Sequence, residues 1–94
     1  MEERIVNGIK ARVAKSFFAR LKGLIGVKDL AEGEGLLIER CSSIHTCFMS
    51  MTIDATFLDE NERVVRIVKG IKPWRLCVLG GKGAKKVLET KSSL

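Results

Sequence analysis

The residues best suited to chemistry are concentrated in one short segment, 41–54. This segment contains the only histidine of the chain, two of its three cysteines and two of its three methionines. If it runs as one extended strand, alternate side chains share a face. The shared face then carries Cys41, Ser43, His45, Cys47, Met49, Met51 and Ile53. Because thiolates, thioethers and imidazoles are ligands for Cu(I) or Zn, the segment predicts either a soft-metal site or a buried strand face.

A metal site in this segment would use Cys41, His45 and Cys47. Same-face neighbours on a strand stand about 7 Å apart, whereas the ligands of one ion lie within about 4 Å of each other. Cys41 and Cys47 could therefore converge only if the strand bends, and the segment has no paired C-x2-C motif. This favours cysteines and methionines that fill an apolar core. A metal-binding or thiol-redox protein that uses the same three residues stays open as an alternative.

Motifs for catalysis are missing from the sequence. There is no G-x-S-x-G elbow, no phosphate loop with Walker spacing and no evident acid–base pair of carboxylates. Gly80-Gly-Lys-Gly83 lacks the Lys-Ser/Thr pair that ends a Walker loop, so it is interpreted as a hairpin loop. The sequence therefore favours a protein that is not an enzyme, with no catalytic residue and no cofactor.

The size and composition of the chain predict one globular domain over residues 1–94. Three cysteines cannot all pair within one chain, which argues against a secreted disulfide framework. No apolar run approaches the roughly 18 residues of a membrane span, and the N-terminus lacks the order of a signal peptide. We therefore expect a soluble, cytoplasmic protein. The absence of Gln, beside many Lys, Glu and Arg, indicates a thermophilic source.

Charge is unevenly distributed along the chain. Residues 1–28 carry a net charge of +5, residues 29–62 carry −7 and residues 63–94 carry +8. An acidic centre between basic flanks predicts internal ion pairing, and a nucleic-acid binder would not need the acidic block. Aromatic residues make up only 5% of the chain, too few for a series of base-stacking platforms. The sequence therefore argues against nucleic acid as a partner.

Short strands joined by turns dominate the predicted elements. Asn7-Gly8 between two apolar segments predicts a type I′ hairpin, and the acidic turn Asp59–Glu62 predicts a second hairpin. Apolar residues at spacings of three and four predict a short amphipathic helix over Phe17–Ile25. We expect a mainly β fold: a small antiparallel β-sandwich or open barrel with one short N-terminal helix.

An ordered set of short motifs resembles domain-of-unknown-function family 192, a group of small uncharacterised bacterial and archaeal proteins. The motifs are Arg20-Leu-Lys-Gly-Leu24, Glu34-Gly-Leu-Leu-Ile38, Cys41-x-Ser-Ile-His-Thr46, Phe48-Met49, Ile53-Asp54, Phe57-Leu-Asp59, Lys72-Pro-Trp-Arg75, Gly83-Ala84 and Val87-Leu-Glu89. The resemblance covers about residues 9–89. It implies a jelly-roll-like β-sandwich and no established activity. Many relatives are exported or anchored, whereas this chain shows no such signal.

The chain departs from the family pattern at two positions, and a third position varies within the family. Thr52 stands where relatives usually have Pro, and Cys47 stands where Phe is common. Another branch of the family has Trp in place of His45. These departures weigh against a metal site built on Cys47 and show that the motif does not require an imidazole.

Unusual polar and aromatic residues gather in two of the matched segments, and these define the candidate ligand site. Its predicted members are His45, Thr46, Met49, Asp54, Trp74 and Arg75. Trp74 beside Arg75 is either a core anchor or a stacking platform for a ligand. Asp54 either holds a turn or pairs with Arg20 or Arg75. His45 either binds a ligand or is held at the core edge by a backbone carbonyl or by Asp54.

The sequence thus favours a non-catalytic binding or accessory module with an unknown small polar ligand. Besides the metal or thiol-redox alternative, a structural or protein-interaction domain stays open, in which strand edges meet a partner. The partner is therefore a small molecule or a protein, and the oligomeric state is undetermined.

Overall fold

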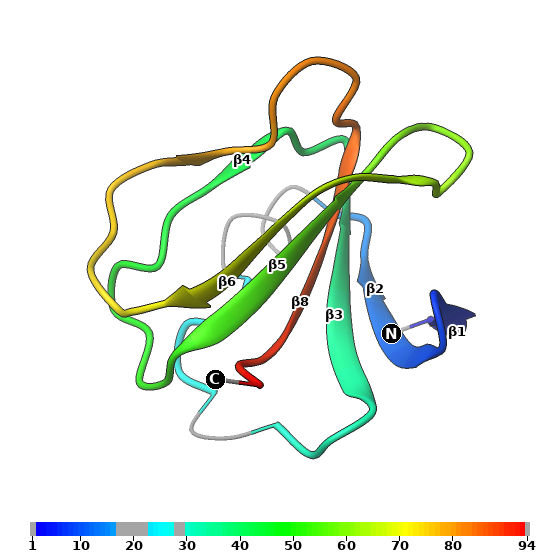
Figure 1. Cartoon of the computed structure of the whole chain (residues 1–94). Helices are drawn as coiled ribbons and strands as arrows, with labels where there is room; N and C mark the ends of the chain where they lie inside the picture. The colour runs from blue at the N-terminus through cyan, green and yellow to red at the C-terminus, as the bar shows by residue number, and fades with distance from the viewer. Residues whose placement is uncertain (1, 17–22, 28–29, 94) are drawn as a thin grey trace.

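The computed structural model describes residues 2–16, 23–27 and 30–93, and Figure 1 shows that strands dominate the described chain. The strands are β1 (Glu3–Val6), β2 (Ile9–Ala14), β3 (Glu34–Glu39), β4 (Ser43–Ile44), β5 (Ile53–Leu58), β6 (Val64–Ile71), β7 (Val78–Leu79) and β8 (Lys86–Lys91). The prediction of a mainly β protein is confirmed.

Six strands form one open sheet in the order β1-β2-β3-β8-β5-β6, and β4 pairs with β7 in a separate two-stranded ribbon. Most neighbours are antiparallel, as predicted, but β2 and β3 are parallel. The expectation of a purely antiparallel arrangement is therefore wrong at this pair. A parallel pair needs a long crossover instead of a tight turn, and here residues 15–33 make that crossover.

Both predicted hairpins are confirmed. At the first turn Asn7 and Gly8 have φ values of 51° and 80°, which is the left-handed backbone that a type I′ turn requires. At the second, between β5 and β6, the carboxylate of Asp59 accepts hydrogen bonds from the backbone N–H groups of Asn61 and Arg63, each 2.9 Å long. Local side-chain chemistry thus determines both turns.

The predicted N-terminal helix is not supported. The part of the chain that the structure describes contains no helix. Residues 17–22, which make up most of the predicted helix, lie outside the described residues. Residues 23–26 form a turn, in which Gly23 and Gly26 have φ values of 52° and 83°. These two glycines favour a turn over a helix end that continues to Ile25.

The large sheet has a hydrophobic cluster on each of its faces. One cluster lies under the β4–β7 ribbon, where Ile44 and Val78 pack with residues of β5 such as Phe57. The other contains Leu37, Leu58 and Leu88, whose side chains point to the opposite face of the same strands. The ribbon and the loops at its end are thus held against the sheet by apolar packing.

Candidate functional site

The segment 41–54 is not one strand, so the prediction that its alternate residues share a face is wrong. β4 ends at Ile44 and β5 begins at Ile53, with an irregular loop between them. Within this loop Phe48 has a φ of 65°, a left-handed backbone that a strand cannot contain. The loop instead places its side chains in several different directions.

The three residues of the metal alternative each have a separate backbone contact. The thiol of Cys41 donates to the carbonyl of Ser43 at 2.9 Å, and the thiol of Cys47 lies 3.8 Å from the carbonyl of Arg75. Nδ1 of His45 accepts the N–H of Cys47 at 3.2 Å. Across residues 2–16, 23–27 and 30–93, no three His, Cys, Asp or Glu side chains come together in a way that could hold a metal ion.

A single buried threonine joins the loop after β4 to the loop after β6. Thr46 is fully buried, and its hydroxyl donates to the carbonyl of Lys72 at 2.6 Å and accepts the N–H of Arg75 at 2.9 Å. Its backbone N–H donates to the carbonyl of Arg75 at 2.9 Å, and its carbonyl accepts the N–H groups of Trp74 and Met49 at 3.0 Å and 3.2 Å. We call this set of five hydrogen bonds the Thr46 clasp.

The clasp brings two aromatic side chains together on the outside of the molecule. The rings of Phe48 and Trp74 lie edge to face, with centroids 4.7 Å apart and an interplanar angle of 60°. Phe48 is 66% exposed and Trp74 is 61% exposed. Trp74 is therefore not the core anchor that was one of its two interpretations. The φ of Trp74 is 70°, so Trp74 has left-handed backbone, as Phe48 does.

Sequence reasoning missed Phe48 as a site residue. In the single-strand interpretation Phe48 falls between the core-facing positions, on the solvent side. A large aromatic residue at a solvent-facing position within a matched motif is the signal that could have identified it.

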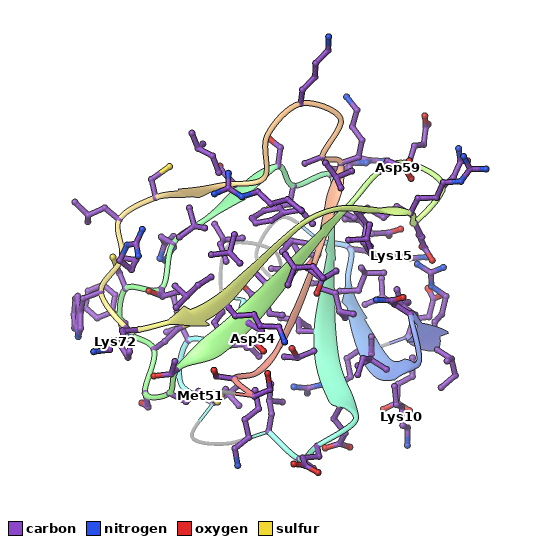
Figure 2. The ribbon with its side chains drawn as sticks, viewed as in Figure 1. Lys10, Lys15, Met51, Asp54, Asp59 and Lys72 are labelled. Atoms are coloured by element: carbon purple, nitrogen blue, oxygen red, sulfur yellow. The ribbon has the colours of Figure 1, made fainter. Side chains whose placement is uncertain are left out.

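Exposed basic and apolar residues flank Trp74 along its loop. Lys72, Arg75 and Leu76 are all exposed, and Figure 2 shows Lys72 at the rim of the molecule. We call the set of Phe48, Lys72, Trp74, Arg75 and Leu76 the aromatic surface. Of the predicted site residues, Trp74 and Arg75 belong to this surface.

The other predicted members of the site support the aromatic surface or lie elsewhere. Thr46 is buried beneath it, and the side chain of Met49 is part of the core cluster under the β4–β7 ribbon. His45 is half-buried and, because its Nδ1 accepts the N–H of Cys47, its local role is to hold the turn before Phe48. This contact is a backbone N–H, not the carbonyl or Asp54 that the sequence suggested.

Asp54 belongs to a second, separate cluster. One carboxylate oxygen accepts the N–H of Gly70 at 2.9 Å, and the other accepts the N–H and hydroxyl of Ser93 at 3.1 Å and 3.2 Å. Asp54 therefore holds a turn and does not pair with Arg75, while its other predicted partner, Arg20, lies outside the described residues. Figure 2 shows Asp54 well away from Lys72, so the sequence wrongly combined two sites.

The pKa of Asp54 is lowered from its usual value of 3.8. Burial by itself would raise this pKa, but hydrogen bonds from Gly70, Ser93 and Ser92 stabilise the carboxylate and outweigh burial. The folded protein thus binds the Asp54 proton more weakly than the unfolded chain does. Asp54 consequently stabilises the fold above about pH 4, and this contribution is lost as the pH falls through its lowered pKa.

We expect Asp54→Asn to lower the free energy of unfolding by about 2 kcal/mol at neutral pH. The variant loses hydrogen bonds to a charged acceptor, and the NH2 group of asparagine cannot accept the N–H of Ser93. The difference in the free energy of unfolding between Asp54→Asn and the parent should become smaller at acid pH. Urea unfolding at about pH 7 and about pH 3 measures both values. A destabilisation that is the same at both pH values would contradict the role assigned to the carboxylate.

Three clefts are lined by described residues, and none of them is lined by the aromatic surface. Their volumes are about 640, 330 and 310 Å³. Cys41 and Arg40 line the first, Asp54 and Ser93 line the second, and Arg12 lines the third. The aromatic surface is not part of the lining of these three clefts, and its two rings are mostly exposed. Among the described residues there is also no helix long and apolar enough to cross a membrane.

The arrangement of strands is shared with two solved bacterial structures. A protein of unknown function from Novosphingobium aromaticivorans has a TM-score of 0.83 and 19% sequence identity, over 90% of this chain and 64% of that chain. A putative transcription regulator from Sinorhizobium meliloti also has a TM-score of 0.83, with 16% identity over 96% of this chain and 78% of that chain. At these identities the likeness defines a class of small mainly β proteins by fold alone.

Sequence comparison then identifies the family: residues 2–94 match DUF192, "Uncharacterized ACR, COG1430", and the chain belongs to that family. A UPF0127 protein from Thermococcus sibiricus is 34% identical over 86% of this chain, and UPF0127 protein PH1112 from Pyrococcus horikoshii is 39% identical over 73% of it. This chain spans only 54% and 62% of those two proteins. The predicted resemblance is confirmed, and these relatives come from thermophilic archaea.

Proposed function

We propose that this chain is a non-catalytic binding module whose aromatic surface holds a partner that carries both an apolar group and a negative charge. The observation that supports this most strongly is the exposed Phe48–Trp74 pair. An aromatic pair held open to solvent by a buried clasp is typical of a contact site, because Trp and Phe are enriched where proteins meet partners.

Backbone strain at the pair supports a binding role. Phe48 and Trp74 both have positive φ values, which cost of order 1 kcal/mol each for residues with a side chain. Such strain persists only where the surrounding contacts impose it, and here the Thr46 clasp fixes the backbone on both sides. The two rings are thus held in place before a partner arrives, so less conformational entropy is lost on binding.

Charge around the pair favours an acidic partner. Between Arg63 and Leu88 the sequence has eight Lys and Arg residues and no Asp or Glu. Within residues 40–58 the only acid is Asp54. Asp54 is only 6% exposed, and its carboxylate already accepts hydrogen bonds from Gly70 and Ser93. The cations of Lys72 and Arg75 therefore have no acid in their own segments, and a complementary partner supplies one.

The position of the aromatic surface also bears on which kind of ligand it binds. The sequence suggested a small polar ligand, which usually occupies a concave pocket. The aromatic surface is outward and combines large apolar side chains with cations. This combination fits the apolar and acidic side chains of a partner protein better than a small polar molecule.

The test uses simple chemical probes and the single tryptophan of the chain. We expect aromatic carboxylates such as phenylacetate to quench or shift the fluorescence of Trp74 and to move the amide signals of residues 45–49 and 72–76. The matched uncharged amides of the same compounds should bind more weakly, since they lack the charge that Arg75 and Lys72 recognise. Nuclear magnetic resonance titration with labelled protein measures both series.

Variants separate the aromatic from the electrostatic part of this binding. Phe48→Ala should weaken the binding of both the carboxylates and the amides. Arg75→Gln should weaken only the binding of the carboxylates, so that the protein no longer prefers them to the amides. Ile5→Ala, at an exposed apolar position on β1, is the matched control and should change neither. Carboxylates that bind mainly outside residues 45–49 and 72–76 would overturn the proposal.

A further inference from the structure

The strand that leads into the aromatic surface is an open edge of the large sheet. β6 pairs with β5 on one side, and no other strand in the described chain pairs with its second edge. In an antiparallel strand, alternate residues direct their N–H and C=O groups away from the neighbouring strand. β6 therefore offers backbone hydrogen-bonding groups along the edge that ends at the loop of Lys72 and Trp74 (Figure 1).

The side chains of β6 are unusually apolar for an exposed edge. Val64, Val65 and Ile67 are 46%, 38% and 51% exposed. β-branched residues have a high strand propensity and usually pack against cross-strand neighbours. Here they lack such a neighbour on the open side of the sheet. A long edge with these residues is a surface for strand addition unless something blocks it.

Two features of β6 disfavour its pairing with the β6 strand of a second copy of this chain. Neither feature disfavours pairing with an acidic strand. The two charged residues of β6, Arg66 and Lys69, are both basic, and Arg63 just before the strand is basic too, so two β6 strands side by side would bring like charges together. Its pairing with β5 also has register shifts near both ends, which bend an edge away from easy self-pairing. A strand with acidic side chains would instead form cross-strand ion pairs with this edge.

We infer that β6 receives an extended acidic segment of a partner polypeptide, which adds to the sheet as a further antiparallel or parallel strand and reaches the aromatic surface with an apolar side chain. The inference rests on the proposed function, because it gives the acidic partner of that surface an extended conformation and a sheet edge to pair with. Main-chain hydrogen bonds supply affinity in such complexes, while alternate side chains supply specificity.

A polypeptide fits this edge better than a nucleic acid does. The apolar pairs Val64-Val65 and Ile67-Val68 are interspersed with the cations of β6, and they would contact nothing complementary on a phosphate backbone. Phe48 and Trp74 form one aromatic pair, whereas single-stranded nucleic acid is usually bound by a series of stacking side chains.

The test uses extended synthetic peptides of eight residues, the length of β6. In one set Val and Thr alternate with Glu and a terminal Leu is present, and in the matched set every Glu is replaced by Lys. We expect only the acidic set to bind, to shift the amide signals of residues 64–69 and to slow hydrogen exchange of the outward amides of β6. Binding should weaken as salt is added.

Substitutions at the two sheet edges provide the control. Ile67→Asp on β6 should weaken the binding of the acidic peptides about tenfold or more, which corresponds to a change of about 1.4 kcal/mol in the free energy of binding. Ile67→Thr keeps a β-branched residue and checks that the fold is unaffected. Ile5→Asp on β1, the opposite edge of the sheet, should have no effect.

Several results would overturn the inference, and they can be told apart from failure of the proposed function. If acidic peptides shift residues 45–49 and 72–76 without protecting the amides of β6, strand addition is wrong while the aromatic surface stands. If they protect β6 and Phe48→Ala has no effect on their binding, the aromatic surface is wrong as their contact. Equal binding of both peptide sets, stronger binding of an oligonucleotide, or self-association of the chain through β6 would each contradict an acidic strand.

Discussion

Replacing Glu89 with methionine should raise the free energy of unfolding at neutral and alkaline pH. Glu89 lies in β8 and is only 1% exposed, and no residue in the described part of the chain forms a hydrogen bond with its Oε1. Its cross-strand neighbours are Leu36 and Ala55, both in the core cluster under the ribbon. A Cβ placed on Gly23 would be 3.5 Å from Oε1, so the backbone at Gly23 covers the carboxyl group.

Burial raises the pKa of Glu89 from 4.5 to about 8. Below about pH 4.5 the side chain is protonated in both the folded and the unfolded chain. Between that pH and about pH 8 the unfolded chain loses the proton while the folded chain keeps it. The free energy of unfolding therefore falls by about 1.4 kcal/mol per pH unit in this window, and the loss is complete once the pH passes the folded pKa.

A methionine of similar length has no proton to lose and suits an apolar site. We expect Glu89→Met to be more stable than the parent by about 3 kcal/mol near pH 7 and about 5 kcal/mol near pH 9, with little difference near pH 5. Urea unfolding at these pH values, followed by circular dichroism, measures the differences. Because Asp54 and Glu62 titrate in both proteins, their contributions cancel in the comparison.

The same substitution at an exposed acid gives the control for Glu89. Glu34→Met, at an exposed position at the start of β3, should change stability only slightly. A difference between Glu89→Met and the parent that is constant from about pH 5 to about pH 9 would show that Glu89 does not carry a raised pKa. A less stable variant at every pH would show that the carboxyl group has a favourable role in the core.

The sequence predicted the parts of this fold that depend on neighbouring residues. The turn at Asn7-Gly8 needs only two residues that tolerate positive φ, and the turn after β5 needs only the carboxylate of Asp59 near two N–H groups. Strand residues are also recognisable from β-branched and apolar composition. These local signals were sufficient for a mainly β prediction.

Apart from the predicted N-terminal helix, which the nearby Gly23 and Gly26 disfavour, the main errors involve residues that are distant in the sequence. Nothing near Phe48 indicates that its backbone turns left-handed, because that turn depends on the clasp between Thr46 and a loop 26 or more residues later. The parallel pairing of β2 with β3 and the burial of Glu89 between two neighbouring strands likewise depend on sheet order. For this reason the sequence combined Asp54 with Trp74, although they belong to separate clusters.

Replacing Thr46 with valine should loosen the aromatic surface and lower the stability of the protein. Valine keeps the shape of threonine but removes the hydroxyl, which leaves the carbonyl of Lys72 without its donor and the N–H of Arg75 without its acceptor. Because Thr46 is fully buried, the methyl group of valine takes the place of the hydroxyl without replacing its hydrogen bonds. Unmade hydrogen bonds of this kind cost about 1–3 kcal/mol each, and water at the exposed loop will recover part of that.

We expect Thr46→Val to lower the free energy of unfolding by about 2 kcal/mol, which corresponds to a fall of about 10 °C in Tm for a domain of this size. The backbone amides of Trp74 and Arg75 should exchange with solvent faster than in the parent. Aromatic carboxylates should bind about tenfold more weakly, since the two rings are no longer held in place before binding.

Two further variants test whether the hydroxyl itself is responsible. Thr46→Ser restores the hydroxyl without the methyl group, and it should recover carboxylate binding and slow amide exchange even if some stability is lost. Thr56→Val makes the same change at a buried threonine in β5, away from the clasp, and should leave both measurements unchanged. If Thr46→Val binds carboxylates as well as the parent does, the clasp is not what prepares the aromatic surface, and the strain at Phe48 and Trp74 needs another cause.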